Sequence, residues 1–218
     1  MDTIVGLGRA GCAIADKFSS YPQYKIFKID SEGIEKKSKN CYLLPKHGDP
    51  EEYEKSVRSM KTFFKGATQD VLFVLSGSGL VSGAALQILK SLQGRNINIL
   101  YIKPDIEFLG HVNILQERTV RNVLQEYTLS GIFERMFLID NLKVEQVIGE
   151  VPIVGYYDKL NELIVSTIHM INVYNHQEPI HETPFDTSET TRISTFGILN
   201  IEKGEEKLAI ISEMLRDG

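Results

Sequence analysis

Short apolar runs alternate with segments of helical periodicity along most of the chain. Five runs have the length and composition of buried strands: residues 3–5, 25–29, 71–75, 97–102 and 136–139. Helical patterns lie between most of these runs, an alternation typical of βαβ units around a largely parallel sheet. We therefore predict an α/β fold in which helices cover both faces of the sheet.

The longest helical pattern lies in the second half of the chain. Between residues 155 and 174 the apolar residues keep a helical period without an interior Gly or Pro, which predicts one long, heavily buried helix. Shorter patterns predict a capped amphipathic helix over residues 49–64 and at least one helix within residues 105–129.

The pattern changes after this long helix. Residues 175–191 are polar, rich in threonine and interrupted by prolines, so we expect an exposed loop there. A strand is expected at residues 192–201 and a closing helix at residues 205–215.

Two glycine-rich turns stand where an apolar run passes into a helical pattern. Residues 6–11 read Gly-Leu-Gly-Arg-Ala-Gly, and residues 76–83 read Ser-Gly-Ser-Gly-Leu-Val-Ser-Gly. A helix start offers unpaired backbone N–H groups and the positive end of the helix dipole, and glycine lets an anion approach that backbone. For each turn, relief of crowding between strand and helix is the alternative interpretation. The presence of both favours a phosphate chain as the ligand.

The first turn also fits the dinucleotide-binding fingerprint Gly-x-Gly-x-x-Gly. Asp30 closes the next predicted strand about 20 residues later, where that fingerprint has its acidic residue. An NAD-binding Rossmann protein therefore stays open as an interpretation. That fold does not call for a second glycine-rich turn, nor for Gly48 beside a third predicted helix start.

Composition narrows the class of protein. The chain has 218 residues, of which 42% are hydrophobic, and a formal net charge of −5, which argues against a nonspecific nucleic-acid binder. No apolar run is long enough to cross a bilayer, and the first residues lack the pattern of a signal peptide. With only Cys12 in a predicted helix start and Cys41 in a polar loop, we expect a cytoplasmic protein without disulfides.

On these motifs the chain resembles the tubulin and FtsZ superfamily of GTP-binding cytoskeletal proteins. Residues 8–18 are similar to the family's first nucleotide loop and helix, and residues 77–85 stand where the family has the signature GGGTGTGAA. Shorter segments match other family motifs. Residues 30–32 and 48–51 resemble the second and third nucleotide loops, residues 102–104 resemble the strand end before the sugar-binding loop, and residues 137–141 resemble the family's "IPND" strand end.

The resemblance implies a divergent, shortened FtsZ-like protein. Its expected architecture is a Rossmann-like parallel sheet of the GTPase-domain type, with a long central helix and a truncated second domain. The corresponding divisions are a nucleotide-binding domain at residues 1–154, the central helix at 155–174, and a loop with the remnant of the activation domain at 175–218.

The same resemblance implies a binding site for GTP or GDP, with Mg²⁺ bound together with the nucleotide. The residues that it places around the phosphates and ribose are Gly8, Arg9, Ala10, Gly11, Cys12, Asp30, Gly48, Gly77, Ser78, Gly79, Leu80, Val81, Ser82, Gly83, Pro104 and Glu107. In the central helix it places Tyr157 against the guanine ring and Asn161 at the guanine edge. From periodicity alone Tyr157 is equally an ordinary core aromatic.

Departures from the family pattern bear on activity. Leu80 and Val81 replace Thr and Gly of the signature, and the loop after the central helix lacks the acidic spacing "NxDxxD", leaving Asp186 and Glu182 as the candidate catalytic residues. We expect guanine-nucleotide binding with weak or absent hydrolysis, together with self-association or assembly with a protein partner. The alternative is a nucleotide-free scaffold that keeps the fold. The histidines lack metal-site spacing.

Overall fold

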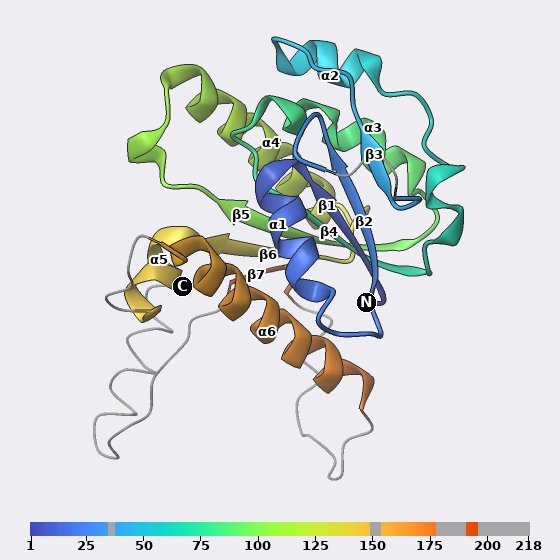
Figure 1. The fold of residues 1–218 in the computed structure, drawn as a ribbon, viewed down its shortest axis with the longest axis vertical. Coiled ribbons are helices and arrows are strands. Elements are labelled where there is room, and N and C mark those ends of the chain that lie inside the picture. The colour runs from blue at the N-terminus through green and yellow to red at the C-terminus, as the bar shows by residue number, and fades with distance from the viewer. Residues whose placement is uncertain (35–37, 149–153, 178–190, 196–218) are drawn as a thin grey trace.

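Parallel strands form one sheet at the centre of the molecule (Figure 1). The computed structural model describes residues 1–34, 38–148, 154–177 and 191–195. Within these residues the sheet has seven strands in the order β3-β2-β1-β4-β5-β6-β7, and every neighbouring pair is parallel. The strands are β1 (Thr3–Leu7), β2 (Lys25–Asp30), β3 (Cys41–Leu43), β4 (Asp70–Leu75), β5 (Asn96–Lys103), β6 (Arg135–Asp140) and β7 (Ile193–Ser194). The predicted parallel α/β fold is confirmed.

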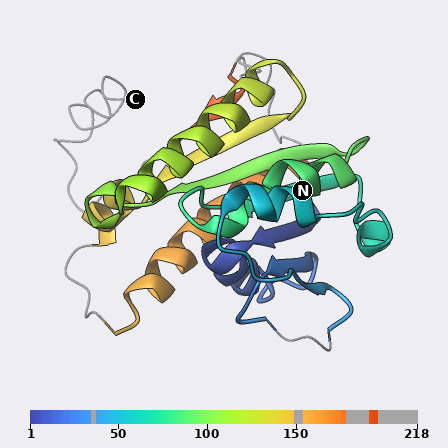
Figure 2. The ribbon, with the colours of Figure 1, turned by 90° about the horizontal axis from the view of Figure 1, so that it is seen from above.

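Helices cover both faces of the sheet, because the strand residues are apolar on both sides. The helices on one face are α1 (Gly8–Phe18), α5 (Asn141–Ile148) and α6 (Tyr156–His176), and those on the other are α2 (Pro50–Ser56), α3 (Ala85–Ser91) and α4 (His111–Leu129). Figure 2 shows α4 and α6 on opposite sides of the strands. In β1, Ile4 packs into the core beneath α1 and α6, and Val5 packs into the core beneath α3 and α4. Period-two alternation thus fills two separate cores.

The long helix is confirmed in extent and corrected in burial. α6 runs from Tyr156 to His176, and one face of it, including Leu160, Ile164 and Ile168, is buried against the sheet. On its outer side Met170 and Tyr174 are 62% and 70% exposed. The helix therefore covers the sheet with one stripe only and is not buried all round.

The helix predicted over residues 49–64 is broken in the structure. α2 ends at Ser56, Val57 is extended, and a 3₁₀ helix, η1 (Phe63–Gly66), follows. Met60 between them is buried, with its backbone N–H donated to the hydroxyl of Ser91 at 3.0 Å. The apolar side chains of this segment pack into the core from an irregular backbone. Their helix-like spacing therefore did not indicate a continuous helix.

Other elements differ from prediction at their edges. Residues 105–129 contain a 3₁₀ helix, η3 (Ile106–Phe108), before α4, while β3 and α5 had no predicted counterpart. Cys41, expected in a loop, begins β3, and α6 extends two residues into the expected loop after position 174. The closing helix at 205–215 and most of that loop lie outside the described residues, as does the strand beyond Thr195. The three-part domain division stays a prediction.

Candidate nucleotide site

The two glycine-rich turns lie side by side at the carboxyl edge of the sheet. β1 and β4 are paired in parallel, with Gly6 opposite Val74. From β1 the chain passes to α1 on one face, and from β4 it passes through a 3₁₀ helix, η2 (Leu80–Ala84), to α3 on the other face. Connections that leave neighbouring strands toward opposite faces form a topological switch point, where open α/β sheets bind their ligands.

The first turn presents an open helix start. α1 begins at Gly8, directly after β1, without a side-chain cap from Leu7 and without an acidic residue in its first turn. Gly8 has φ +70°, which favours glycine, and a Cβ atom there would meet no atom of the part of the chain that the structure describes within 4 Å. The backbone N–H groups of this first turn have no partner within the helix, so they and the helix dipole favour an anion here.

Gly11 in the same turn has a packing role. A Cβ atom on Gly11 would collide with the backbone carbonyl oxygen of Val74 in β4. Glycine therefore allows α1 to approach β4 closely, and the crowding interpretation is correct for this position. It brings the open end of α1 against the second turn.

The second turn is held by packing. A Cβ atom on Gly77 would collide with the Tyr101 hydroxyl, and one on Gly83 would collide with the backbone of Pro50. Both glycines are explained by close approach of neighbouring elements. Gly79 differs, because no atom of the described residues lies within 4 Å of its Cβ position and its φ is −83°.

Ser82 closes the second turn from within. Its hydroxyl lies 2.8 Å from the carbonyl oxygen of Gly77 and 2.6 Å from that of Gly79, and it accepts a bond from the Gln116 amide at 3.3 Å. The residue is 4% exposed. Its polar atom is thus engaged inside the turn, which stabilises the loop but leaves no free hydroxyl for a phosphate oxygen.

A buried polar group supports the turn from below. The Tyr101 hydroxyl donates to the backbone oxygen and to Oε1 of Glu117, each at 3.2 Å, and Arg121 Nε donates to that carboxylate at 2.8 Å. Burial and the neighbouring carboxylate of Glu117 raise the pKa of Tyr101 well above its ordinary value. The phenol therefore stays protonated beneath Gly77.

The two apolar residues of the second turn have different surroundings. Val81 is partly buried and packs against the core shared with α3 and α4. Leu80 is 37% exposed. The extra bulk relative to the family signature therefore goes into the core at Val81 and stays at the surface at Leu80.

The third predicted phosphate loop is occupied by its own side chains. The carboxylate of Asp49 accepts bonds from the backbone N–H groups of Glu51 at 2.7 Å and Glu52 at 3.3 Å, and Pro50 stands at the helix start. These are the N–H groups that a phosphate would use at this helix. Gly48 itself has no neighbour from residues 1–34, 38–148, 154–177 or 191–195 within 4 Å of its Cβ position.

A charged rim surrounds the first turn. Arg9 has a 91% exposed side chain, and its guanidinium lies 3.5 Å from Glu32 Oε1, while Lys46 Nζ lies 2.6 Å from Glu32 Oε2. The pKa of Glu32 is lowered, chiefly by its hydrogen bond with Lys46. Arg9 of α1 and Lys46 of the loop after β3 therefore meet at Glu32 in the exposed region beside the helix start.

Two predicted ligands near the first turn point inward. Asp30 is 6% exposed, its carboxylate accepts a bond from the Ser31 backbone N–H at 2.7 Å, and burial raises its pKa. The thiol of Cys12 is buried, 3.5 Å from the carbonyl oxygen of Gly6, and burial raises its pKa to about 12. Cys12 is therefore a protonated packing residue beneath the turn.

The two residues expected to contact the base lie at the start of α6. Tyr157 is 70% exposed, with its ring edge-on to that of Tyr156 at 5.1 Å, so the interpretation of Tyr157 as a core aromatic is wrong. Asn161 is half-buried one turn further along the same helix. Burial, followed by a hydrogen bond with Glu145, raises the pKa of Tyr156 to about 12.

Asn141 adds a polar atom that sequence reasoning missed. Its side-chain oxygen is buried and has no hydrogen-bond partner among the described residues. It follows Asp140, which ends β6 and forms an ion pair with Lys103 at 2.6 Å. The similarity of this strand end to the family's "IPND" motif was the signal that could have identified Asn141.

The remaining predicted residues are spread along the loop after β5 or are not described. Pro104 is half-buried and Glu107 is exposed in η3, with its backbone N–H bonded to Asp105 at 2.9 Å. Asp186 and Glu182 lie outside the described residues. Within the described part of the chain no group of three His, Cys, Asp or Glu side chains is placed to hold a metal ion.

Comparison with solved structures decides the fold. No protein-family model matches the chain, and no curated protein matches it. A structure of CetZ2 from Haloferax volcanii, a GTPγS-bound protofilament, superposes with a TM-score of 0.63 and 18% identity, over 86% of this chain. An empty FtsZ dimer and an FtsZ W319Y mutant, both from M. jannaschii, each give 0.64, with 16% and 15% identity over 84% and 83% of this chain.

The chain has the tubulin/FtsZ-like fold. It spans 61%, 57% and 58% of the length of these three structures, so the similarity covers only part of each. At this level of identity the likeness establishes the tubulin/FtsZ-like architecture and leaves ligand and activity to the residues. No described helix combines the length and apolarity that a membrane span requires.

Proposed function

We propose that this chain binds a guanine nucleotide, GTP or GDP, at the carboxyl edge of its sheet, and that it hydrolyses GTP weakly or not at all. One observation carries the proposal: the uncapped start of α1 at Gly8 lies at a topological switch point, beside a second turn whose Gly79 borders open space. An anion with several phosphate groups fits such a place, because both backbones leave room for its oxygens.

The phosphates are proposed to bind mainly at the first turn. Its N–H groups lack partners within the helix, and Arg9 and Lys46, which share the Glu32 carboxylate, leave one net positive charge on the exposed side. The second turn contributes through the open backbone at Gly79. The start of α2 contributes little, because the carboxylate of Asp49 already bonds the N–H groups there.

The base is proposed to lie at the start of α6. Tyr157 offers an exposed aromatic ring, and Asn161 and Asn141 offer amide groups, of which the Asn141 oxygen is a buried acceptor without a partner among the described residues. Guanine presents adjacent N–H donors on one edge, so it matches free acceptor atoms. This match and the tubulin/FtsZ-like fold favour a guanine nucleotide over NAD.

We expect weak hydrolysis because the hydroxyl group of the second turn is already hydrogen-bonded within the protein. The Ser82 hydroxyl bonds its own turn, and Leu80 stands where the family has a threonine hydroxyl. Asp186 and Glu182 remain the proposed acidic residues of the loop after the central helix. Mg²⁺ would therefore be held chiefly by the nucleotide itself, since the described residues offer no preformed cluster of ligands.

Calorimetric titration with GTP, GDP, ATP and NAD tests the proposal. We expect heat of binding with the guanine nucleotides and little with ATP or NAD. Gly79→Val should weaken binding at least tenfold, because a branched side chain fills the space of a phosphate oxygen. Gly66→Val is the matched control, since Gly66 precedes β4 and a Cβ there has only the Lys25 ammonium near it, at 3.8 Å. Absence of binding to folded protein, or tightest binding of NAD, would refute it.

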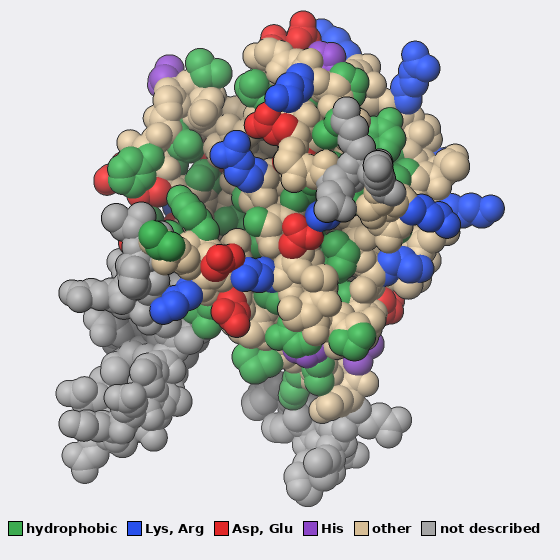
Figure 3. Space-filling view, viewed as in Figure 1, with side chains coloured by type: hydrophobic (Ala, Val, Ile, Leu, Met, Phe, Trp, Pro, Cys, Tyr) green, Lys and Arg blue, Asp and Glu red, His purple; other side chains and the backbone are tan. Residues whose placement is uncertain are grey.

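A nucleotide-free scaffold is the second candidate, favoured by an exposed apolar corner. Its members are Ile106, Phe108, Val112 and Leu115, which are 40%, 87%, 68% and 50% exposed. Apolar side chains gather on the left of Figure 3, where η3 and the start of α4 form a projecting corner. Such a patch is typical of a protein contact, so it also supports self-association. Sedimentation velocity of the wild type and Phe108→Asp, with and without GTP, separates association from nucleotide dependence.

A further inference from the structure

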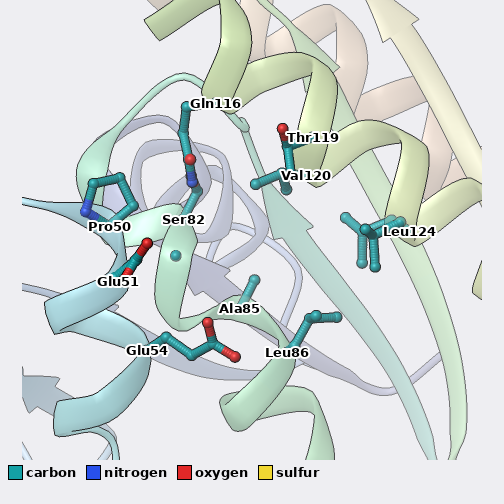
Figure 4. A pocket seen from close by; sticks show the side chains of 12 residues that line it. Pro50, Glu51, Glu54, Ser82, Ala85, Leu86, Gln116, Thr119, Val120 and Leu124 are labelled. Atoms are coloured by element: carbon teal, nitrogen blue, oxygen red, sulfur yellow. The ribbon is translucent and has the colours of Figure 1, made fainter. Parts of the chain in front are cut away.

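A cavity lies among the helices on the α4 side of the sheet, and Ser82 and Gly83 of the second turn form part of its wall. It has a volume of about 280 Å³ and is bounded by α2, by η2 with α3, and by α4 (Figure 4). The side chains of Ala85, Leu86, Val120 and Leu124 give it an apolar lining. Such a space accommodates one small apolar group, such as a phenyl ring with a short chain.

The polar atoms around this cavity are almost all acceptors. The hydroxyl of Thr119 donates to the Leu115 carbonyl oxygen at 2.8 Å, and the Ser82 hydroxyl is engaged inside the second turn. One N–H of the Gln116 amide is donated to Ser82 at 3.3 Å, which leaves the second N–H and the amide oxygen. A ligand that supplies mainly donors therefore fits most of the remaining polar capacity.

Charge selects the kind of donor. Glu51 and Glu54 line the α2 side, and the residues that surround the cavity include no Lys, Arg or His. Glu51 pairs with Lys55 at 3.2 Å, whereas Glu54 has no ion-pair partner in the described part of the chain. Figure 4 shows the Glu54 carboxylate directed along the opening toward Leu86. A cationic group at the opening would therefore meet an unpaired carboxylate next to an apolar wall.

We propose that this cavity binds a small organic ammonium compound, with its apolar body between α3 and α4 and its ammonium group at Glu54. An ammonium group has three N–H donors and no acceptor, which matches the acceptors at the rim. A carboxylate or phosphate on the same body would be repelled by Glu51 and Glu54. The proposal does not depend on nucleotide binding.

Methyl NMR on the full chain with phenethylammonium as the probe tests the proposal. The methyl signals of Leu86, Val120, Val123 and Leu124 should shift with saturation. Phenethyl alcohol, which lacks the charge, should bind more weakly, and hydrocinnamate, which carries a carboxylate, should bind weakest. Equal binding of the ammonium and the carboxylate, or shifts confined to other methyl groups, would overturn the proposal.

Two variants test separately the contribution of the Glu54 carboxylate and that of the open cavity. Glu54→Gln removes an exposed, unpaired carboxylate, so we expect roughly threefold to fivefold weaker binding of phenethylammonium and unchanged binding of phenethyl alcohol. Glu126→Gln, at an exposed position of α4 outside the cavity, is the matched control and should change neither. Thr119→Phe, at an exposed position on the rim, should weaken both probes by obstructing the opening. Wild-type affinity for phenethylammonium in both Glu54→Gln and Thr119→Phe would overturn the assignment.

Discussion

The two glycine-rich turns at the carboxyl edge look alike as sequences and differ in how the helix after each one begins. In the first turn α1 starts without a cap, and Gly8 is required by its φ of +70° while its Cβ position is open. In the second turn Gly77 and Gly83 are required by collisions with Tyr101 and Pro50, and Ser82 closes the loop with its own hydroxyl. Each turn also has glycines of the other kind, Gly11 in the first and Gly79 in the second, so the turns differ mainly in that α1 starts without a cap whereas Ser82 closes the second loop.

This difference matters for how a phosphate site is recognised. A glycine that avoids a collision indicates only that two elements approach closely, whereas a glycine beside open space leaves room for a ligand. By this criterion Gly8, Gly48 and Gly79 are candidates, and Gly11, Gly77 and Gly83 serve the packing of α1, α2 and β4. A substitution at one of the packing glycines would reduce nucleotide binding by disturbing the fold, so it could not test the site.

The largest effect that sharpens this contrast is expected from Gly83→Ala. The added Cβ would lie 2.7 Å from the carbonyl carbon and 2.9 Å from the Cα of Pro50, and backbone atoms cannot rotate away. We expect a loss of about 3 kcal/mol in the free energy of unfolding, at the upper end for overpacking. Urea denaturation followed by circular dichroism measures it.

Gly79→Ala is the matched control in the same turn. Its Cβ position is open and its backbone is in an ordinary extended conformation, so the change should lie within about 1 kcal/mol of zero, or be slightly stabilising. If the two alanine variants lose equal stability, packing does not distinguish the glycines of the second turn.

Ser82→Ala should have an intermediate effect on the second turn. The change removes the bonds to the carbonyl oxygens of Gly77 and Gly79 and leaves the Gln116 amide without its acceptor. We expect a loss of about 1 to 2 kcal/mol in the free energy of unfolding, again from urea denaturation. Ser78→Ala is the control, because the Ser78 hydroxyl forms no hydrogen bond with another described residue. A loss as large for Ser78→Ala would show that Ser82 does not hold the turn.

The strands of the sheet can be predicted well from the sequence, whereas the structural roles of the glycines in the turns cannot. Strands of a parallel sheet are buried on both faces, so β1, β4, β5 and β6 stand out as continuous apolar runs. The three-residue edge strand β3 has no such run, because Tyr42 is exposed and its neighbours are only partly buried. The apolar residues 57–64 misled the prediction, since an irregular segment can fill a core as well as a helix can.

The sequence predicts that the candidate site lies at one edge of the sheet, but it does not predict which side chains face the site. That the motifs would meet at one side of the sheet follows from parallel strands. Whether a side chain faces outward does not follow, and Asp30 and Cys12 prove to be buried beneath the first turn. The collision of a Cβ at Gly77 with Tyr101 depends on a contact between β4 and β5 side by side in space, which no local pattern contains.

The smallest expected effect concerns the interior of the first turn and depends on pH. Burial raises the pKa of Asp30 in the folded protein above its ordinary 3.8. At pH 7 the carboxylate is ionised in both the folded and the unfolded chain, and the folded chain carries the unfavourable free energy of burying the charge. Asp30→Asn lacks this charge and keeps an oxygen that can accept the Ser31 N–H, so it should be the more stable protein at pH 7.

That advantage should shrink as the pH falls through the folded-state pKa, because Asp30 then takes up a proton in the folded protein, and it should vanish below pH 3.8. Urea denaturation of both proteins between pH 3 and pH 7 measures the difference, with Glu126→Gln on exposed α4 as the control that should show no such trend. If Asp30→Asn is less stable than the wild type at pH 7, the bond of 2.7 Å from Ser31 to the charged carboxylate outweighs its burial. A buried charge beneath the first turn would then stabilise the folded protein. The two turns would in that case differ only in how their residues pack.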